Sequence, residues 1–338
     1  MVRFAVMANG TFDTTPWQSA LNEAIRDPAE LCRLLGLDPA LALDAEQAAK
    51  GFSLLVPRPY LARIRPGDPT DPLLLQVLPR ATETIATAGY RTDPLGEVDA
   101  LRGPGLLRKY QGRTLMVTSG ACAVHCRFCF RRHFPYRETS SGGSAFPSAL
   151  QEIAADRSIR EVVLSGGDPL ILSDRELAEL AEKLAQIPHL RRLRVHSRMP
   201  VMIPQRVTDE LLSLLRGGRL STMVVVHVNH PAEIDAAVTT AFGRLIDAGV
   251  PVLGQSVLLR GVNDRADVLD ALCQRLIDLR VIPYYLHQLD AVAGAAHFEV
   301  PVAAGVALIE ELRARLPGYG VPRYVRETPG GASKEPLA

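Results

Sequence analysis

The chain has 338 residues, of which 47% are hydrophobic and 22% are charged, and its formal net charge is +1. This is the composition of a globular protein with a substantial core, and the near-neutral charge excludes the strongly basic field typical of nucleic-acid-binding proteins. The sequence has no apolar run long enough to span a membrane and no secretory signal in its first twenty residues, so we expect a cytoplasmic protein that binds neither membrane nor nucleic acid.

Helices separated by proline-rich connections are predicted for the N-terminal part of the chain. Their sequences are WQSALNEAIR from Trp17, PAELCRLLGL from Pro28 and DAEQAAKGF from Asp44. The segment DPLGEVDALRGP, residues 93–104, contains turn-forming glycine and proline residues and is a candidate linker. We therefore expect residues 1–104 to form an N-terminal helical region.

Beyond residue 112, short runs of β-branched residues alternate with amphipathic helical patterns. The predicted strands span residues 114–118, 161–165, 192–196, 222–228, 252–257 and 282–287. One predicted helix opens at Ser173 with a capping box completed by Glu176, another begins at Pro231, and a third covers residues 302–315. Strands joined by crossover helices form a parallel sheet, but six β–α units fall short of the eight in a closed barrel. On this pattern alone, a partial barrel and an open doubly wound sheet fit equally well.

Polar residues follow each of the six predicted strands. The segments concerned are a cysteine-rich loop at 119–136, SGGDPL from Ser165, HSRMP from His196, HVNHP from His227, QSVLLRGVND from Gln255 and HQLD from His287. Helix capping accounts for one or two polar residues of this kind, but not for six in succession. Because ligands of parallel α/β proteins bind at the carboxyl ends of the strands, the pattern predicts an active site there.

Three of the five cysteines, Cys122, Cys126 and Cys129, lie within eight residues of one another. Soft thiolates select zinc, copper(I) or iron–sulfur clusters, and a structural zinc site needs four protein ligands. The candidates for a fourth ligand are His125, His133, Cys32 and Cys273. The two remaining cysteines lie in helical patterns and are more typical of core residues. The alternative is a four-iron cluster with three thiolates, in which one iron stays open to a substrate or cosubstrate.

The C-x3-C-x2-C spacing, followed by a GGD sequence after the next strand, resembles the radical S-adenosylmethionine (SAM) superfamily. The segments CRFCFRRHFPY, LSGGDPL, HSRMP, HVNHP, PYYLHQLD and PGGASK occur in the order seen in lysine 2,3-aminomutases, over essentially the whole chain. CFRRHFPY and DAVAGAAHF resemble the short branch that makes β-lysine for elongation factor P (EF-P). The resemblance implies an α/β fold with a partial (β/α)6 radical SAM barrel over residues 105–320. It also implies a C-terminal tail, residues 321–338, that carries a pyridoxal phosphate (PLP) lysine.

Cofactor roles follow from the resemblance, residue by residue. Cys122, Cys126 and Cys129 match the ligands of a 4Fe–4S cluster whose open iron binds SAM. Lys334 matches the lysine that binds PLP covalently, although a lysine so near a chain end is by itself more typical of solvated surface. The residues implied as further PLP contacts are Arg113, Gln255 and Lys109. The residues implied as SAM contacts are Ser165, Gly166, Gly167, Asp168, Arg198 and His227.

The resemblance also implies the substrate and its contacts. Arg131 matches the arginine that binds the substrate carboxylate, and Asp290 and Glu327 match the acids that bind its ε-ammonium group. The implied activity is an isomerase converting L-lysine to β-lysine for the modification of EF-P. The alternatives are an aminomutase for free lysine in another pathway or for another amino acid, and a structural zinc or electron-transfer protein. The implied partners are lysine, an external reductant such as flavodoxin or ferredoxin and an EF-P lysyl ligase, and the chain is a candidate homo-oligomer.

Overall fold

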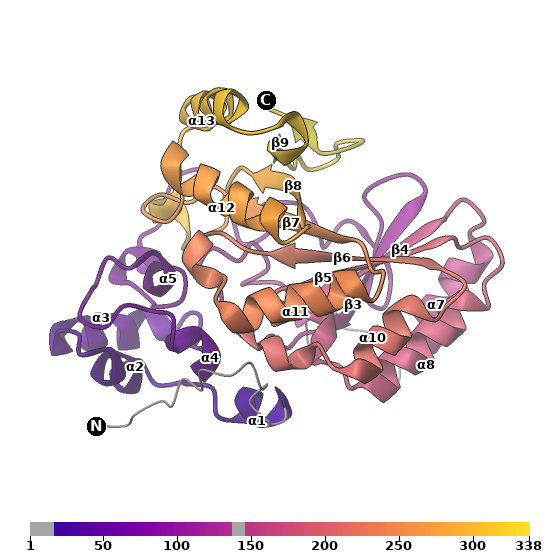
Figure 1. Ribbon diagram of the computed structural model, residues 1–338, viewed down its shortest axis with the longest axis horizontal. Helices are drawn as coiled ribbons and strands as arrows, with labels where there is room; N and C mark the ends of the chain where they lie inside the picture. The colour runs from indigo at the N-terminus through magenta and orange to yellow at the C-terminus, as the bar shows by residue number, and fades with distance from the viewer. Residues whose placement is uncertain (1–16, 137–145) are drawn as a thin grey trace.

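The computed structural model describes residues 17–136 and 146–338, shown in Figure 1. The first sixteen residues, which contain most of the segment where no secretory signal is expected, lie outside the described residues. Within the described part, none of the helices has the length and apolar character needed to cross a membrane.

A sheet of ten strands forms the centre of the fold, and its strand order follows the chain order. Strands β3 to β9 run parallel to their neighbours. Their bounds are Arg113–Ser119, Glu161–Gly166, Arg192–Ser197, Ser221–His227, Val252–Val257, Ile282–His287 and Arg323–Arg326. The short strands β1 (Leu101–Gly103), β2 (Leu106–Leu107) and β10 (Glu335–Pro336) pair antiparallel at the two edges. The predicted α/β class with a parallel sheet is confirmed, and the six predicted strands match β3 to β8 to within one residue at each end.

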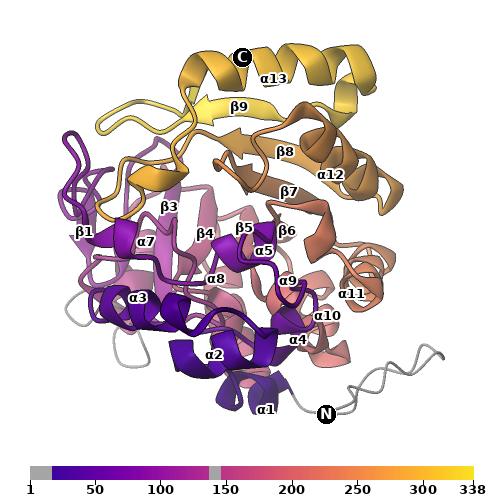
Figure 2. The same ribbon diagram turned by 90° about the vertical axis from the view of Figure 1, so that its left-hand side faces the viewer.

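Helices cover the outer face of the sheet, as Figures 1 and 2 show. The crossover helices are α7 (Phe146–Ala155), α8 (Asp174–Ala185), α9 (Met199–Met202), α10 (Asp209–Arg216), α11 (Ala236–Asp247), α12 (Ala266–Asp278) and α13 (Val302–Arg315). Helix α8 begins with the predicted capping box, in which Ser173 and Glu176 bond each other's backbone N–H groups. Its buried leucines, Leu177, Leu180 and Leu184, are spaced by one helical turn and face the sheet.

The helix predicted to begin at Pro231 starts later. Pro231–Glu233 forms a single 3-10 turn, and α11 begins at Ala236 with Asp235 as its N-cap. The turn is specified by Glu233, whose buried carboxylate accepts hydrogen bonds from the backbone N–H groups of Asn229 and His230. Pro231 therefore begins a single turn, and this turn places the carboxylate of Glu233 in the interior of the protein.

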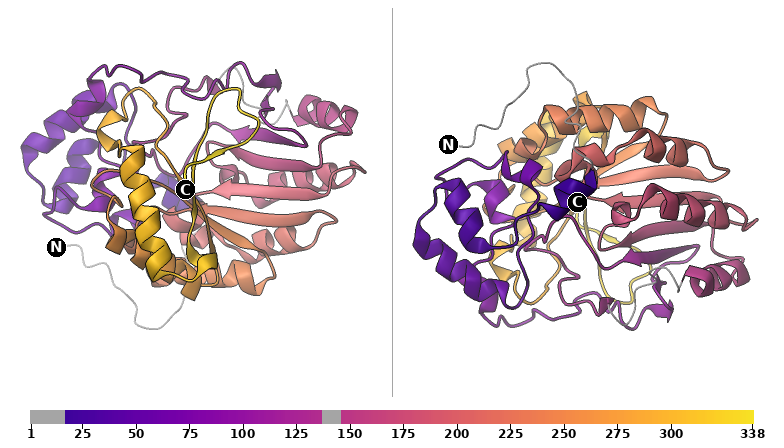
Figure 3. Two further views of the ribbon diagram at one scale, coloured as in Figure 1. Left: turned by 90° about the horizontal axis from the view of Figure 1, so that it is seen from above. Right: turned by 90° about the horizontal axis from the view of Figure 1, so that it is seen from below.

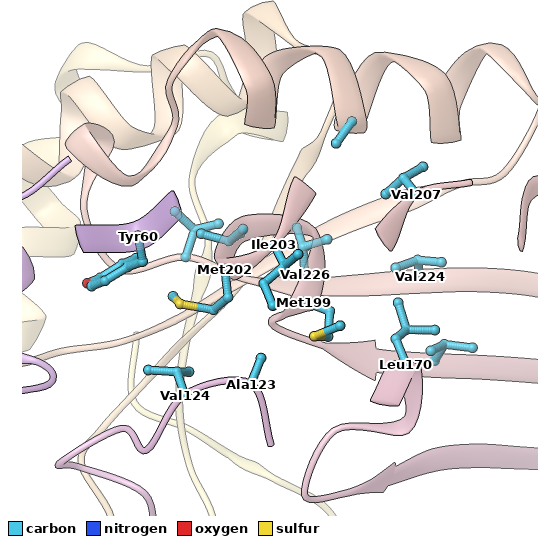
Figure 4. Close-up of a cluster of buried hydrophobic side chains, with 14 of the residues drawn as sticks. Tyr60, Ala123, Val124, Leu170, Met199, Met202, Ile203, Val207, Val224 and Val226 are labelled. Carbon is cyan, nitrogen blue, oxygen red and sulfur yellow. The ribbon is translucent and has the colours of Figure 1, made fainter. Parts of the chain in front are cut away.

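The N-terminal helices lie at one end of the parallel strands, as Figure 3 shows from above and below. They are α1 (Trp17–Asn22), α2 (Pro28–Leu35), α3 (Pro39–Ala49), α4 (Arg58–Leu61) and α5 (Pro72–Leu75). Figure 4 shows Tyr60 of α4, Val124 of the cysteine-rich loop and Met202 of α9 in one buried cluster. Burial of each such side chain stabilises the fold by about 1.5–3 kcal/mol, so this cluster ties the helices and the loop to the sheet.

The segment 93–104 is not the exposed linker that its glycine and proline content predicted. Leu95 and Glu97 are buried, and residues 101–103 form strand β1. The β1–β2 hairpin spans residue 104, where the N-terminal region was expected to end. The division into residues 1–104, 105–320 and 321–338 stays a prediction.

Candidate active site

A cavity of about 660 Å³ lies at the carboxyl ends of the parallel strands. Every residue assigned to the site from the sequence lines it. These residues are Lys109, Arg113, Cys122, Cys126, Cys129, Arg131, Ser165, Gly166, Gly167, Asp168, Arg198, His227, Gln255, Asp290, Glu327 and Lys334. All of them except Lys109, which lies between β2 and β3, come from strands β3 to β9 and the loops that follow. The sheet must therefore curve around the cavity as a partial barrel does.

The cysteine-rich loop, residues 119–136, is held against the N-terminal helices by backbone hydrogen bonds. His125 N–H donates to Leu55 O at 3.0 Å, and Arg127 N–H donates to Gln76 O at 2.9 Å. Between these two points the chain turns so that Cys126 faces the cavity with Cys122 and Cys129. The loop is thereby fixed before any ligand binds.

Burial and the neighbouring thiols together raise the pKa of Cys122 well above its usual range and that of Cys129 to about 11, so these two thiols are protonated at neutral pH. Metal binding requires thiolates and therefore releases protons at such a site. A positive charge lies beside the thiols, because Arg198 Nη1 is 2.8 Å from Cys126 Sγ. Three thiols that line one cavity beside a guanidinium fit a multi-iron cluster better than a single metal ion.

None of the four candidates for a fourth metal ligand points to the three thiols. His125 Nδ1 lies 2.9 Å from Ser53 O, and His133 Nε2 lies 3.0 Å from Ala293 O. Cys32 and Cys273 are buried in the apolar faces of α2 and α12. In the two described stretches of chain, no three side chains of histidine, cysteine, aspartate or glutamate converge as ligands of a single metal ion.

Arg198, expected to contact SAM, is held in place by two buried side chains from distant parts of the chain. Its Nη2 donates to Gln76 Oε1 at 2.6 Å and to Glu233 Oε2 at 2.9 Å. These bonds fix the guanidinium against Cys126, so Arg198 joins the N-terminal region, the sheet and the cluster site. Asp168 contributes to the same arrangement, since its carboxylate accepts hydrogen bonds from the backbone N–H groups of Arg198 and Met199. The carboxylate of Asp168 therefore serves to orient the chain, and the sequence did not predict this role.

Two glycines, Gly166 at the end of β4 and Gly167 directly after it, allow the chain to approach the cysteine-rich loop. Gly167 N–H donates to Ser119 O at 2.7 Å, and a Cβ atom at Gly167 would lie 2.2 Å from Ala121 O. Gly166 has a φ of +122°, and a Cβ there would lie 2.6 Å from Ser119 O. The sequence predicted a close approach of these glycines to a ligand, whereas the close approach in the structure is to the backbone of the loop.

We expect a Gly167→Ala substitution to destabilise the protein by about 1–3 kcal/mol, because the obstructing atoms belong to the backbone and cannot rotate away. Thermal unfolding of the purified protein measures this effect. Gly243→Ala in α11 is the matched control, since a Cβ there meets nothing within 4 Å and should stabilise the helix by about 0.5–1 kcal/mol. Equal unfolding temperatures for the two variants would contradict the expected steric conflict.

Five side chains of alternating charge form a continuous row along the cavity wall, here called the charge row. Its members in order are Arg131, Glu97, Lys109, Glu327 and Lys334. Lys109 Nζ lies 3.1 Å from Glu97 Oε1 and 2.7 Å from Glu327 Oε1. Glu327 also accepts a hydrogen bond from the ammonium group of Lys334. Burial opposes ionisation of Glu327, but the ammonium groups of Lys334 and Lys109 outweigh it and lower its pKa to about 2.

The charge row gives the protein partners of two residues for which ligand contacts are expected. Lys109, expected as a further PLP contact, bridges two carboxylates. Arg131, expected to hold a substrate carboxylate, already holds that of Glu97. Glu327 accepts hydrogen bonds from two ammonium groups, as a residue that binds a substrate ammonium group must be able to do.

Asp290 differs from the other acids because it has no strong cationic partner. Burial and the charge of Glu327 raise its pKa to about 7, although Lys334 and Lys109 act in the opposite direction. Near neutral pH this carboxyl group is therefore divided between its two protonation states. A ligand ammonium group would stabilise the ionised state.

We accordingly expect lysine to bind more weakly as the pH falls from about 8 to about 6, by up to roughly tenfold per pH unit below the pKa of Asp290. Protonation of the carboxyl group removes the negative charge that pairs with the ligand's ε-ammonium group. Titration calorimetry at a series of pH values measures the effect. Asp290→Asn should flatten the profile, and norleucine, which lacks the ε-ammonium group, should bind without this dependence. A profile for lysine that is unchanged in Asp290→Asn would contradict the assignment.

Two residues that line the cavity carry buried nitrogen atoms without a hydrogen-bond partner in the described chain. In the described chain, Arg113 Nε and His196 Nε2 are buried without a hydrogen-bond partner. The guanidinium of Arg113 stacks on Tyr110, with its carbon 4.6 Å from the ring centroid. Buried polar atoms without partners are uncommon, and both residues line the cavity with Lys334. A guanidinium with an uncommitted N–H group fits an anionic cofactor such as PLP.

Several residues of the site gave no signal in the sequence. Glu97 lies in an apparent linker, and Gln76 and Glu233 lie in segments typical of helix ends. Their roles depend on partners that are far away in the chain, such as Arg198 for both Gln76 and Glu233. His227 and His287 line the cavity as uncharged imidazoles at neutral pH, since burial lowers the pKa of each to about 3.

Comparison with known proteins bears on the identity of this site. Residues 116–272 match the radical SAM superfamily. The chain is 45% identical to the L-lysine 2,3-aminomutase of Haemophilus influenzae over 94% of each chain. It is 45% identical to the L-lysine 2,3-aminomutase of Escherichia coli, over 95% of this chain and 94% of that protein. It is 38% identical to the L-lysine 2,3-aminomutase of Clostridium subterminale, over 96% of this chain and 78% of that protein. With this similarity over nearly its whole length, the chain belongs to the lysine 2,3-aminomutase family of the radical SAM superfamily.

Proposed function

We propose that the protein is an L-lysine 2,3-aminomutase, an isomerase that moves the amino group of L-lysine from carbon 2 to carbon 3. The observation that carries this proposal is that one cavity is lined by three cluster thiols, Lys334 and charged groups for both ends of a lysine molecule. The names of the relatives support the same activity.

Three cofactors are implied, and the cavity offers residues for each. Cys122, Cys126 and Cys129 would hold the 4Fe–4S cluster of a radical SAM protein, beside which SAM would bind. Lys334 and Arg113 would hold PLP, with Gln255 as a further contact. When bound, the cluster and SAM supply a carbon-centred radical, and PLP supplies covalent attachment to the migrating nitrogen.

The protein's own residues bind and orient the substrate. Arg131 would bind its α-carboxylate, because a guanidinium pairs with a carboxylate through two parallel hydrogen bonds. Asp290 and Glu327 would bind its ε-ammonium group. Fixing both ends of the molecule places the carbon atoms between them in one position, and the buried walls keep water from a reactive intermediate.

An amino acid with an acidic side chain does not suit this cavity. Asp290 and Glu327 would repel a second carboxylate, so the alternative of a glutamate aminomutase is not favoured. A structural zinc or electron-transfer protein does not fit either, because none of the candidate fourth ligands approaches the thiols. An external one-electron donor, such as flavodoxin or ferredoxin, is required by the chemistry. Delivery of β-lysine to EF-P through a lysyl ligase, a cytoplasmic location and a homo-oligomeric state stay predictions from the resemblance.

An anaerobic assay with a panel of amino acids tests the proposal. The reconstituted protein is incubated with SAM, PLP, a reductant and either L-lysine, L-ornithine or L-glutamate, and the products are separated by mass and chirality. We expect β-lysine from L-lysine and much slower or no conversion of the others. Conversion of glutamate without conversion of lysine would overturn the proposal.

A further inference from the structure

The guanidinium of Arg131 is held along one edge by Glu97. Nε donates to Oε2 at 2.6 Å, and Nη2 donates to Oε1 at 2.8 Å. Both side chains are almost fully buried, with exposed fractions of 6% for Arg131 and 3% for Glu97. Two parallel charge-assisted bonds fix the plane of a guanidinium as well as its position. Arg131 is therefore pre-oriented in the ligand-free cavity.

The second edge of the same guanidinium, between Nη1 and Nη2, is held only by neutral acceptors. Nη1 donates to Ser165 Oγ at 3.1 Å and, more weakly, to Gly166 O at 3.4 Å. Nη2 carries a second N–H group that has no partner within residues 17–136 and 146–338. A guanidinium has five N–H groups arranged as two forks, and Glu97 uses only the inner one. The outer fork can donate to a second carboxylate through the spare N–H of Nη2 and an Nη1 N–H that gives up its long bond to Gly166 O, without displacing Glu97.

Glu97 is itself fixed from both sides. Its Oε1 lies 3.1 Å from Lys109 Nζ, and Lys109 in turn bonds Glu327. Burial alone would raise the pKa of Glu97, but attraction by Arg131 and Lys109 brings it below its usual range. The carboxylate of Glu97 is therefore ionised at neutral pH. Its negative charge offsets part of the cost of burying the positive charges of Arg131 and Lys109.

We propose that Glu97 is a positioning residue for substrate recognition: it holds the inner edge of Arg131, so that the outer edge binds the α-carboxylate of the amino acid. Through this contact the protein distinguishes lysine from the corresponding diamine, which has no carboxylate. Without Glu97, the side chain of Arg131 could adopt several rotamers. The protein would then distinguish lysine from the diamine less well. The inference rests on the proposed function, since it takes Arg131 as the carboxylate-binding residue.

Glu97→Gln tests the inference, because glutamine keeps the shape and loses the charge. Titration calorimetry of the reconstituted protein gives dissociation constants for L-lysine and for 1,5-diaminopentane, the amine without the carboxylate. We expect the lysine dissociation constant to rise by about 10-fold to 100-fold, with the diamine changed by less than about 2-fold. With turnover, KM for lysine should rise more than kcat falls.

The cysteine-rich loop offers a matched control. Glu83 bonds Arg127 Nε at 2.9 Å and Nη2 at 2.6 Å, in a buried pair of the same geometry. Neither of these two residues lines the cavity, and the second guanidinium that Glu83 binds, that of Arg132 at 2.7 Å, does line it. Glu83→Gln should lower the unfolding temperature as Glu97→Gln does, while leaving the ratio of lysine to diamine affinity unchanged. If Glu97→Gln does not fold, Glu97→Asp is the second variant, because aspartate keeps the charge on a shorter side chain. It should change the ratio of lysine to diamine affinity in the same direction by a smaller factor.

The possible results separate the inference from the proposed function. If Glu97→Gln weakens both ligands equally, the residue is structural only and the inference is wrong. If lysine binds more tightly, Glu97 competes with the substrate for Arg131, which also overturns the inference. If the unsubstituted protein does not prefer lysine to the diamine, the role of Arg131 in the proposed function fails instead.

Discussion

Replacing Lys334 with alanine should reduce β-lysine formation by at least about 10³-fold while leaving the iron–sulfur cluster and the cleavage of SAM intact. PLP needs an amine for covalent attachment, and Lys334 presents one to the cavity beside Arg113. The position near the chain end does not leave this lysine free in solvent. Strand β10 pairs with β9, and the flanking Glu335 forms an ion pair with Arg326 at 2.9 Å, so the tail is folded back over the site.

Borohydride trapping followed by peptide mass spectrometry identifies the residue that binds PLP. The label should appear on Lys334 and be absent from Lys334→Ala. Lys109→Ala is the matched control, because Lys109 is a second lysine of the same cavity and the same charge row. This control should still be labelled at Lys334. Labelling of Lys109, or full activity of Lys334→Ala, would show that the assignment is wrong.

A Cys126→Ala substitution should abolish both cluster assembly and the reductive cleavage of SAM. A cluster held by three thiolates has no spare protein ligand. The other candidate ligands cannot replace Cys126, because His125 and His133 bond backbone carbonyl groups and Cys32 and Cys273 are buried in helix faces. Removal of Cys126 also leaves Arg198 facing the cavity without the sulfur it contacts at 2.8 Å. Iron and sulfide analysis with electron paramagnetic resonance of the reduced protein gives the result.

Cys273→Ala provides the corresponding control for Cys126→Ala. Cys273 is buried in the core cluster around α12 and α13, so its loss should lower stability by about 1 kcal/mol without changing the iron content. A Cys126→Ala protein that retains four irons and cleaves SAM would contradict the assignment of the cluster ligands.

The sheet was predictable from the sequence because each buried parallel strand is a short, nearly continuous run of apolar residues. TMVVVHV in β6 is an example, with its three central valines buried. Strand β9 was missed because its sequence, RYVR, has only two buried residues between two exposed arginines. The helix start at Pro231 was misplaced because a first-turn proline suits a single 3-10 turn as well as an α-helix. The 3-10 turn forms here because the buried carboxylate of Glu233 binds the backbone N–H groups before it.

The members of the site were predictable, but their partners were not. Residues at the ends of parallel strands meet at one edge of a sheet whatever the details of packing, and this brought the sixteen assigned residues to one cavity. The ion pairs between them join residues far apart in the chain, such as Lys109 and Glu327, which are separated by 218 positions. A buried glutamate in a glycine- and proline-rich segment, such as Glu97, has no local pattern that distinguishes it from a solvated one.

The position of the migrating nitrogen tests the central claim most directly. L-lysine labelled with ¹⁵N at the α-amino group is incubated anaerobically with the reconstituted protein, SAM, PLP and a reductant, and the product is examined by nuclear magnetic resonance. We predict that ¹⁵N appears on carbon 3 of β-lysine, since on the proposed contacts the cavity would hold the carboxylate and the ε-ammonium group while the α-nitrogen moves. SAM cleavage with the label remaining on carbon 2 would contradict the proposed aminomutase activity.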